Sequence, residues 1–326
     1  MRNTKIPRPC RRRAIRAGGR TAFSVPGFPP AMFFLVIFPI IVFLSCATVS
    51  PVDGRPLDVA ATLDDVRPLW RPFPGGDAGT TDICLAYFSG RVSQPRLEFH
   101  ALRMYLSSPA LRIVAAGGKD GTTADYTLST RVSSFVRDNG LLAGINALPF
   151  SPVSGREGEL RTNIGLVVSD GRMISPPEPR LDALVFFADG SAEIKSQGDI
   201  SCVGDIANAV GGFRRILEDS ELVPRVLDLQ PRHPRSAAGI SSCGRFLYLL
   251  AIDGRRRGSV GTTEAETALL LRALGAAEGI NFDGGGSTSL VMRFPDGRIR
   301  VANTPIHRQI PGRERAVAGV LGIGKR

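Results

Sequence analysis

The chain has few cysteines, and their spacing gives no support for a zinc site. Five are present among 326 residues, and no two of them form a C-x-x-C pair, which commonly supplies two zinc ligands. Cys10 and Cys46 lie near the N-terminus, which leaves Cys84, Cys202 and Cys243 in the body of the chain. Because three is an odd number, we expect at most one disulfide there.

Acidic residues are absent from the first 45 residues, which hold eight of the 41 lysines and arginines. The net charge of +11 at pH 7 falls to +3 when these eight are removed. The rest of the chain has no dense lysine and arginine stripe with interleaved aromatic residues, the pattern that follows a phosphate backbone. We therefore predict no nucleic-acid partner.

The apolar run at residues 32–45 contains a proline and is short for a membrane-spanning helix. A basic segment followed by such a run is the layout of an export signal. Its end, F-L-S-C, resembles a bacterial lipobox, in which a lipid is attached to the cysteine after cleavage. We expect export and a membrane anchor in the bacterial cell envelope through lipid on Cys46. A signal cleaved near Ala47, giving a secreted or periplasmic protein, and an uncleaved anchor remain alternatives.

Composition divides the chain into three parts. Residues 1–45 form the leader, and residues 46–80 are rich in proline, glycine and small polar residues, which is typical of a tether and entry segment. The remainder, 81–326, is the size of a single domain.

Four places show two apolar runs around a tight-turn signal, and each predicts a β-hairpin. Their turns contain D-G or C-G pairs, in which glycine supplies the positive φ that a two-residue turn requires. A further strand is expected at 97–106, where apolar and polar residues alternate. The four hairpins span 164–174, 183–194, 238–253 and 289–301.

Two segments, 127–140 and 262–275, predict helices. Apolar residues share one face of the first, whereas in the second Thr263 and Glu266 form a capping box and Gly275 stands where a helix ends.

A short apolar strand follows each helix and ends at an asparagine, Asn146 or Asn281. Together these elements predict an α+β fold: a mixed, mostly antiparallel sheet with several hairpins and two main helices in one domain.

The segment that follows the second of these strands reads D-G-G-G-S-T. Glycines allow a ligand or another backbone segment to approach closely, and successive N–H groups can bind an anion. The hydroxyl groups that follow add hydrogen-bond donors. The pattern matches neither a Walker loop nor a dinucleotide-binding loop, and by itself it is more typical of a tight turn. Its candidate ligand-binding residues are Gly284, Gly285, Gly286 and Ser287.

Three further motifs carry charge. R-H-P-R-S at 232–236 contains Arg235, which can pair with a phosphate or lie in a surface turn. In A-I-D-G-R at 251–255, the aspartate can form a salt-bridged turn or serve in catalysis or metal binding. The last motif, from N-T-P to E-R-A-V, lies at 303–318.

The order of these motifs closely resembles the phosphodiester glycosidase family. Its signatures run H-P-R-T, D-G-R and N-L-D-G-G-G-S, followed by N-x-P and E-R-x-V. The resemblance covers roughly residue 99 to the C-terminus, and N-x-D-G-G-G-S is its specific part. This chain departs from the family at one motif: it has N-A-L-P-F at 146–150, where the family usually has N-G-G-F-F. The difference bears on how a substrate fits near Asn146.

The resemblance implies hydrolysis of a sugar that is joined through its anomeric carbon to a phosphodiester in an envelope or environmental glycan. Phosphate is a good leaving group, so cations matter more than a strong acid, and we assign Arg235 and Arg255 to this role. Asp283 is the first choice, and Asp253 the second, for the carboxylate that stabilises the oxocarbenium-like centre or activates water.

The remaining candidates bind or support. Asn146 and Asn281 are expected to orient either sugar hydroxyls or the glycine loop, and Ser287 to bind the phosphate or the carboxylate. The supporting residues are His233, as a proton carrier or a positional residue, Asn303, and an ion pair of Glu314 with Arg315.

Two other functions remain open. One is a non-catalytic envelope lipoprotein that binds a glycan or a partner on the same scaffold. The other is a phosphodiesterase that breaks the P–O bond with a divalent metal on Asp253 and Asp283. No cofactor is predicted for the glycosidase.

Overall fold

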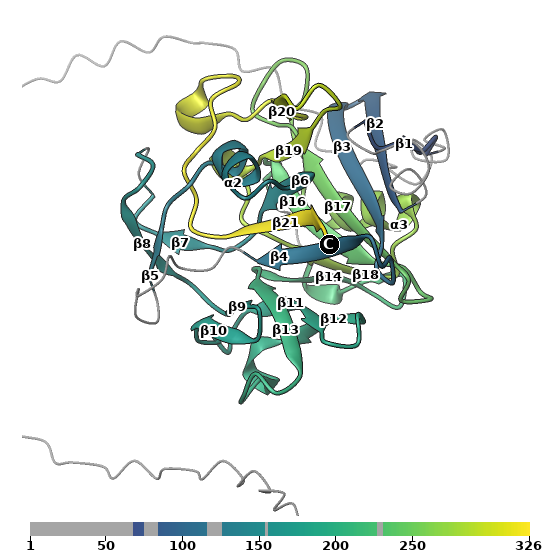
Figure 1. Ribbon diagram of the computed structural model, residues 1–326. Helices are drawn as coiled ribbons and strands as arrows, with labels where there is room; N and C mark the ends of the chain where they lie inside the picture. Colours follow the sequence, from purple (N-terminus) through teal and green to yellow (C-terminus); the bar gives the residue numbers. More distant parts are fainter. Residues whose placement is uncertain (1–67, 75–83, 116–125, 154–155, 227–230) are drawn as a thin grey trace, which may run out of the picture. The chain divides into compact units, whose positions relative to one another are not determined.

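The computed structural model describes residues 68–74, 84–115, 126–153, 156–226 and 231–326 (Figure 1). The predicted leader, Cys46 and most of the predicted tether lie outside these residues. No helix in the described ranges is long and apolar enough to cross a membrane.

The fold is β-rich, and the prediction of an α+β class was wrong. The described residues form 21 strands but only two α-helices, α2 (Val132–Asp138) and α3 (Glu264–Leu274), and the strands pair in antiparallel fashion. The sequence correctly indicated both helices, but many strands have only two to five residues, which is too short for a clear alternating pattern. Their number makes this a β fold with two short helices.

Eight strands form the largest sheet, and its central strands carry the predicted motifs at their ends. In spatial order they are β1 (Arg71–Pro72), β2 (Leu85–Ser93), β3 (Arg96–Tyr105), β17 (Phe246–Ile252), β16 (Arg235–Ile240), β18 (Glu278–Asn281), β14 (Arg214–Glu218) and β15 (Glu221–Leu222).

A second sheet of five strands carries Asn146 at the end of its central strand. Its order is β20 (Ile299–Val301), β19 (Leu290–Arg293), β6 (Ala143–Asn146), β21 (Val320–Lys325) and β4 (Leu111–Ala115). Figure 1 shows α2 beside β6 and β19, where it covers one side of this sheet.

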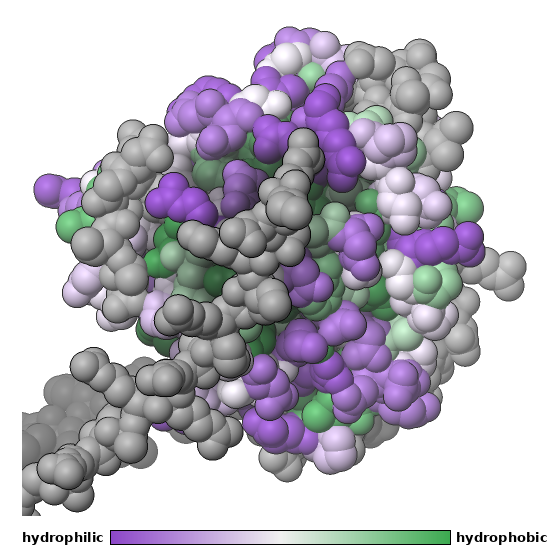
Figure 2. All heavy atoms as spheres, turned by 60° about the horizontal axis from the view of Figure 1, so that its bottom comes forward, coloured by the Kyte–Doolittle hydropathy of each residue, from purple (hydrophilic) through white to green (hydrophobic). Residues whose placement is uncertain are grey.

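The other two sheets, of five and three strands, carry none of the predicted site residues. One has the order β10 (Arg172–Ser175), β9 (Val167–Ser169), β13 (Ile206–Gly211), β11 (Asp182–Phe187) and β12 (Ala192–Ser196), and the other β5 (Tyr126–Leu128), β8 (Leu160–Asn163) and β7 (Phe150–Ser151). Figure 2 turns the β9–β13 side toward the viewer and shows hydrophilic residues interrupted by smaller hydrophobic areas.

All four predicted hairpins form, as β9–β10, β11–β12, β16–β17 and β19–β20. The capping box of α3 is also present: Thr263 Oγ1 accepts from the Glu266 N–H at 3.1 Å, and Glu266 Oε2 accepts from the Thr263 N–H at 2.9 Å. The described cysteines, Cys84, Cys202 and Cys243, are all free.

Apolar side chains join the eight-stranded sheet to the sheet that contains β6 and fix their strand ends. Leu249 and Ile280 of the eight-stranded sheet lie in one buried cluster with Ile145 and Leu290 of the second sheet. Burial of each such side chain contributes about 1.5–3 kcal/mol. This packing brings Asn146, at the end of β6, close to the glycine loop that follows β18.

Candidate active site

Strand register explains why distant motifs meet at one edge of the eight-stranded sheet. Arg235 at the start of β16 pairs with Ile252 at the end of β17, and Ala237 pairs with Asn281 at the end of β18. The three motifs that begin or end these strands therefore emerge together. The Gly285 N–H donates to the Pro234 carbonyl at 2.8 Å, which ties the glycine loop to the R-H-P-R-S motif.

Asn146 holds the glycine loop in place. Its side chain is buried, and its Nδ2 donates to the Asp283 carbonyl at 2.5 Å. Its Oδ1 accepts from Ser236 Oγ at 2.7 Å and from the Ser289 N–H at 3.0 Å. Because these contacts are within the protein, Asn146 orients the loop, which was one of its two predicted roles.

The glycines allow neighbouring groups to lie directly against the loop. A Cβ on Gly284 would lie 2.7 Å from the Pro234 carbonyl oxygen, and one on Gly286 would lie 2.5 Å from Arg315 Nη2. Gly285 has a φ of +60° and faces the Arg255 guanidinium. The absence of side chains thus lets two arginines approach the loop from different motifs.

Asp283 lies at the start of this loop. Its backbone N–H donates to the Ala147 carbonyl at 2.8 Å. Burial raises the pKa of Asp283 from 3.8 to about 6, although hydrogen bonds from Ser287 and the Gly284 N–H and the charge of Arg315 lower it. A carboxyl group that titrates near neutral pH is therefore fixed beside hydrogen-bond donors and cations.

The cations come from two further motifs. Arg315 Nη1 donates to Ser287 Oγ at 3.0 Å, and the exposed Arg255 places Nη2 3.1 Å from His233 Nδ1. Burial lowers the pKa of His233, and the charges of Arg255 and Arg235 lower it further, so this ring is neutral at pH 7. The arrangement suits an anionic ligand.

The sequence profile of the phosphodiester glycosidase family matches residues 139–324, more than half of the chain. The chain belongs to the phosphodiester glycosidase family. This confirms the resemblance inferred from the motifs, and with it the assignment as a hydrolase. Asn146, Asp283 and Arg315 all lie within the matched segment.

Solved structures share the fold of this phosphodiester glycosidase. The zebrafish N-acetylglucosamine-1-phosphodiester alpha-N-acetylglucosaminidase catalytic domain, auto-inhibited by pro-peptide, is 18% identical with a TM-score of 0.56, over 79% of this chain and 88% of that one. A hypothetical protein from Synechocystis is 14% identical, also with a TM-score of 0.56, over 75% of this chain. This match spans only 62% of the Synechocystis chain. No curated protein matched the sequence.

Arg235 and Asn281 meet an acidic side chain that sequence reasoning missed. Glu264 is buried at the first position of α3. Its Oε1 accepts from Asn281 Nδ2 at 3.3 Å and lies 3.6 Å from Arg235 Nη1, and its Oε2 lies 3.5 Å from Arg214 Nε. An acidic residue in the first turn of a capped helix was a visible signal, but it suggested only stabilisation of that helix.

Asp253 is buried, and its carboxylate is held by three hydrogen-bond donors, one of which, Asn303 Nδ2, also donates to the Thr288 carbonyl of the glycine loop at 3.1 Å. Its Oδ1 accepts from Asn303 Nδ2 at 3.2 Å and from the Thr304 N–H at 2.8 Å, and its Oδ2 accepts from Arg256 Nη2 at 2.5 Å. Both carboxylate oxygens are therefore occupied. Within the described ranges, no group of three or more His, Cys, Asp or Glu side chains is placed to hold a metal ion.

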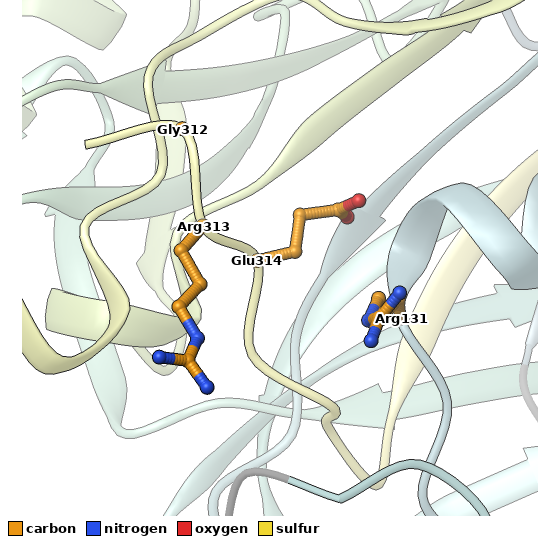
Figure 3. A pocket seen from close by; sticks show the side chains of 4 residues that line it. All are labelled: Arg131, Gly312, Arg313 and Glu314. Atoms are coloured by element: carbon orange, nitrogen blue, oxygen red, sulfur yellow. The ribbon is translucent and has the colours of Figure 1, made fainter. Parts of the chain in front are cut away.

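The Glu314 side chain contacts the first turn of α2 instead of forming the predicted ion pair with Arg315. Its carboxylate accepts from the Ser133 N–H at 3.2 Å and from the Ser133 hydroxyl, and burial raises its pKa. Figure 3 shows it extending toward α2, whereas the Arg313 side chain points in another direction. With Arg131, Gly312 and Arg313 it lines a pocket of about 280 Å³.

Two polar side chains outside the predicted set also join the site. Ser236 donates to Asn146, and His307 accepts from Arg315 Nε at 3.1 Å through its Nδ1. Ser236 follows Arg235 directly in the R-H-P-R-S motif, so its position was a usable signal. His307 lies between the N-T-P and E-R-A-V signatures, and only the folded structure places it beside the glycine loop.

Proposed function

We propose that this phosphodiester glycosidase hydrolyses the bond between the anomeric carbon of a sugar and the oxygen of a phosphodiester, releasing free sugar and a phosphomonoester. The observation that carries the proposal is the Asp283 carboxyl, which titrates near pH 6 in a glycine loop contacted by two arginines. The substrate class is a phosphate-linked glycan of the envelope or the environment.

The charges of the site match the charges that develop in this reaction. When the C–O bond breaks, its electron pair leaves with the phosphate, whose negative charge increases, and positive charge develops on the sugar ring. Arg255 and Arg315 stabilise the departing phosphate. The ionised Asp283 either stabilises the ring or removes a proton from the attacking water, whose oxygen then joins the anomeric carbon.

The altered N-A-L-P-F motif is compatible with catalysis. Ala147 and Leu148, which replace the two usual glycines, are buried, and the Ala147 carbonyl still accepts from the Asp283 N–H. Leu148 packs against Gly319, where a Cβ on the glycine would lie only 2.4 Å from the leucine Cβ. The burial of Leu148 and the retained Ala147 contact to the glycine loop support the glycosidase over the non-catalytic glycan binder.

The proposal is tested by incubating the purified full-length chain with a panel of sugar-1-phosphodiesters that differ in the sugar and in the alcohol on phosphate. We expect release of free sugar from at least one of them. A protein with a cooperative thermal transition that releases no sugar from any of them would contradict the proposal.

The rate should depend on the ionisation of Asp283. Because the carboxylate form is the active one, kcat/KM should rise about tenfold per pH unit below pH 6 and level off above it. The measurement is a profile of kcat/KM from pH 4 to 8 in buffers of constant ionic strength. A rate that falls as the pH rises through 6 would instead make Asp283 a general acid.

We further propose that the protein is exported and anchored by lipid on Cys46, on the support of the leader sequence alone. Mass spectrometry of the membrane-extracted protein should find an N-terminus at Cys46 carrying acyl chains. Cys46→Ser should abolish this modification, whereas an unmodified N-terminus near Ala47 would indicate a secreted or periplasmic protein.

A further inference from the structure

His307 stands on a backbone segment that is fixed beside the glycine loop. The short 3-10 helix η4 (His307–Gln309) packs against η3 (Gly285–Ser287), which is the glycine loop itself. The His307 N–H donates to the Arg313 carbonyl at 3.1 Å, and Arg308 has a left-handed φ of 53°. Such a constrained backbone holds the imidazole ring in a defined position.

Arg315 determines which nitrogen of this ring carries the proton. Its Nε lies 3.1 Å from His307 Nδ1, and a guanidinium nitrogen can only donate a hydrogen bond. His307 Nδ1 must therefore be an acceptor without a proton. Burial lowers the pKa of His307, and the charges of Arg315, Arg313 and Arg308 lower it further. The ring is thus neutral at pH 7, with its single proton on Nε2.

The Nε2–H group is a buried donor without an acceptor among the residues that the structure describes. His307 is only 4% exposed, and no described group lies in hydrogen-bond geometry with its Nε2. A buried donor left in this state destabilises the folded protein, so its presence calls for a functional explanation.

The neighbours of the ring indicate what the acceptor is. Arg315 links His307 to Ser287, and Ser287 in turn donates to Asp283, so the ring belongs to the same network as the proposed catalytic carboxylate. The charged groups that act on the ring are three arginines, which favour an anion over a neutral sugar hydroxyl. An arginine that donates to Nδ1 also makes Nε2–H a stronger donor.

We propose that His307 is a substrate-binding residue, which donates a hydrogen bond from Nε2 to an oxygen of the substrate phosphate. This inference rests on the proposed function, because it assumes a phosphodiester beside Asp283. It assigns the phosphate to the side of the glycine loop that faces η4 and Arg315.

The chain is well suited to a direct test, because it contains only three histidines, His100, His233 and His307. Full-length protein with 15N-labelled histidine gives three imidazole signal sets, and the His307→Gln variant assigns one of them. At pH 7 we expect the His307 ring to be neutral and protonated on Nε2. Inorganic phosphate and dimethyl phosphate, as monoester and diester probes, should both shift its Nε2 signal. His100, which is hydrogen-bonded to Tyr87 at 2.7 Å, serves as the internal control.

The proposal is overturned if the His307 ring is protonated on Nδ1, or if both phosphate probes leave its Nε2 signal unmoved. This readout does not depend on turnover. If the wild-type protein cleaved no sugar phosphodiester but phosphate moved the Nε2 signal, the proposed function would fail while His307 remained a phosphate ligand.

Variants separate ligand binding from structural support. His307→Leu removes the donor and should lower kcat/KM for a sugar-1-phosphodiester about tenfold, the typical effect of losing a hydrogen bond to a charged group. His307→Gln retains an N–H donor near the position of Nε2 and should recover part of this loss. Equal losses in both variants, accompanied by equal falls in melting temperature, would indicate a structural residue instead.

Discussion

Replacing Asp283 with asparagine should lower kcat/KM on the order of 1000-fold, which corresponds to about 4 kcal/mol of transition-state stabilisation. The asparagine preserves the size of the side chain and leaves the backbone contacts to Asn146 and Ala147 in place. It cannot carry the negative charge that stabilises the sugar ring or accept a proton from water. The measurement compares initial rates of sugar release by wild type and variant at pH 7.

The same substitution should make the protein more stable above pH 6. The pKa of Asp283 is about 6 in the folded chain and near 3.8 when unfolded, so the folded state binds the proton more tightly. The contribution of protonated Asp283 to the free energy of unfolding is therefore fully present below about pH 4, and it is lost as the pH rises to about 6. Asparagine does not ionise, so the stability of Asp283→Asn relative to wild type should increase across this window.

Urea unfolding of both proteins at pH 4, 5, 6 and 7 checks this expectation. A stable, inactive variant is the signature of a carboxylate whose burial serves function at the expense of stability. A variant that retains more than a tenth of the wild-type rate would exclude Asp283 as the main catalytic carboxylate.

Replacing Asp253 with alanine should have the opposite pattern, a large loss of stability with little change in the chemistry of the folded protein. The substitution removes acceptors from Arg256 and Asn303 and from the Thr304 N–H. The Thr304 N–H then has no acceptor, while Arg256 keeps Glu98 and Asn303 keeps the Thr288 carbonyl. Loss of the buried carboxylate should lower the free energy of unfolding by about 3 kcal/mol. Urea unfolding measures that loss, and kcat/KM of the folded fraction should stay within tenfold of wild type.

The activities of variants at these two aspartates distinguish the glycosidase from the metal phosphodiesterase. If both carboxylates held a metal, Asp253→Ala would be inactive even where it is fully folded, and added divalent cations would affect the wild-type rate. The matched variant Asp253→Asn keeps the side-chain volume and should lose less stability than Asp253→Ala. An inactive Asp253→Asn with wild-type stability would support the metal enzyme.

Local signals in the sequence were sufficient to predict many of the elements around the site. The capping box at Thr263 and Glu266 predicted α3, and the D-G and C-G turns predicted the hairpins, because these features depend on residues within one turn. The overall balance of helix and strand was misjudged because strands such as β4 and β14 are recognisable mainly through their pairing, which involves residues far apart in the sequence.

In the candidate site, too, local sequence signals identified individual residues but not the contacts between distant ones. The N-F-D-G-G-G-S-T motif identified Asp283 and its glycines, but the order of motifs does not say which side chains touch. The two aspartates looked alike in sequence, each at the end of an apolar strand, and only burial and hydrogen bonding separated their environments. The roles of Glu264 and His307 depend on long-range packing: Glu264 lies in a helix cap, and His307 lies between the N-T-P and E-R-A-V signatures.

The most direct test of the proposed chemistry is the fate of the solvent oxygen. A sugar-1-phosphodiester that releases free sugar is hydrolysed by the wild-type protein in water enriched in 18O, and both products are analysed by mass spectrometry. Cleavage of the glycosidic C–O bond predicts that the label enters the sugar and is absent from the phosphomonoester. Label in the phosphate would show P–O cleavage and would contradict the role proposed for Asp283.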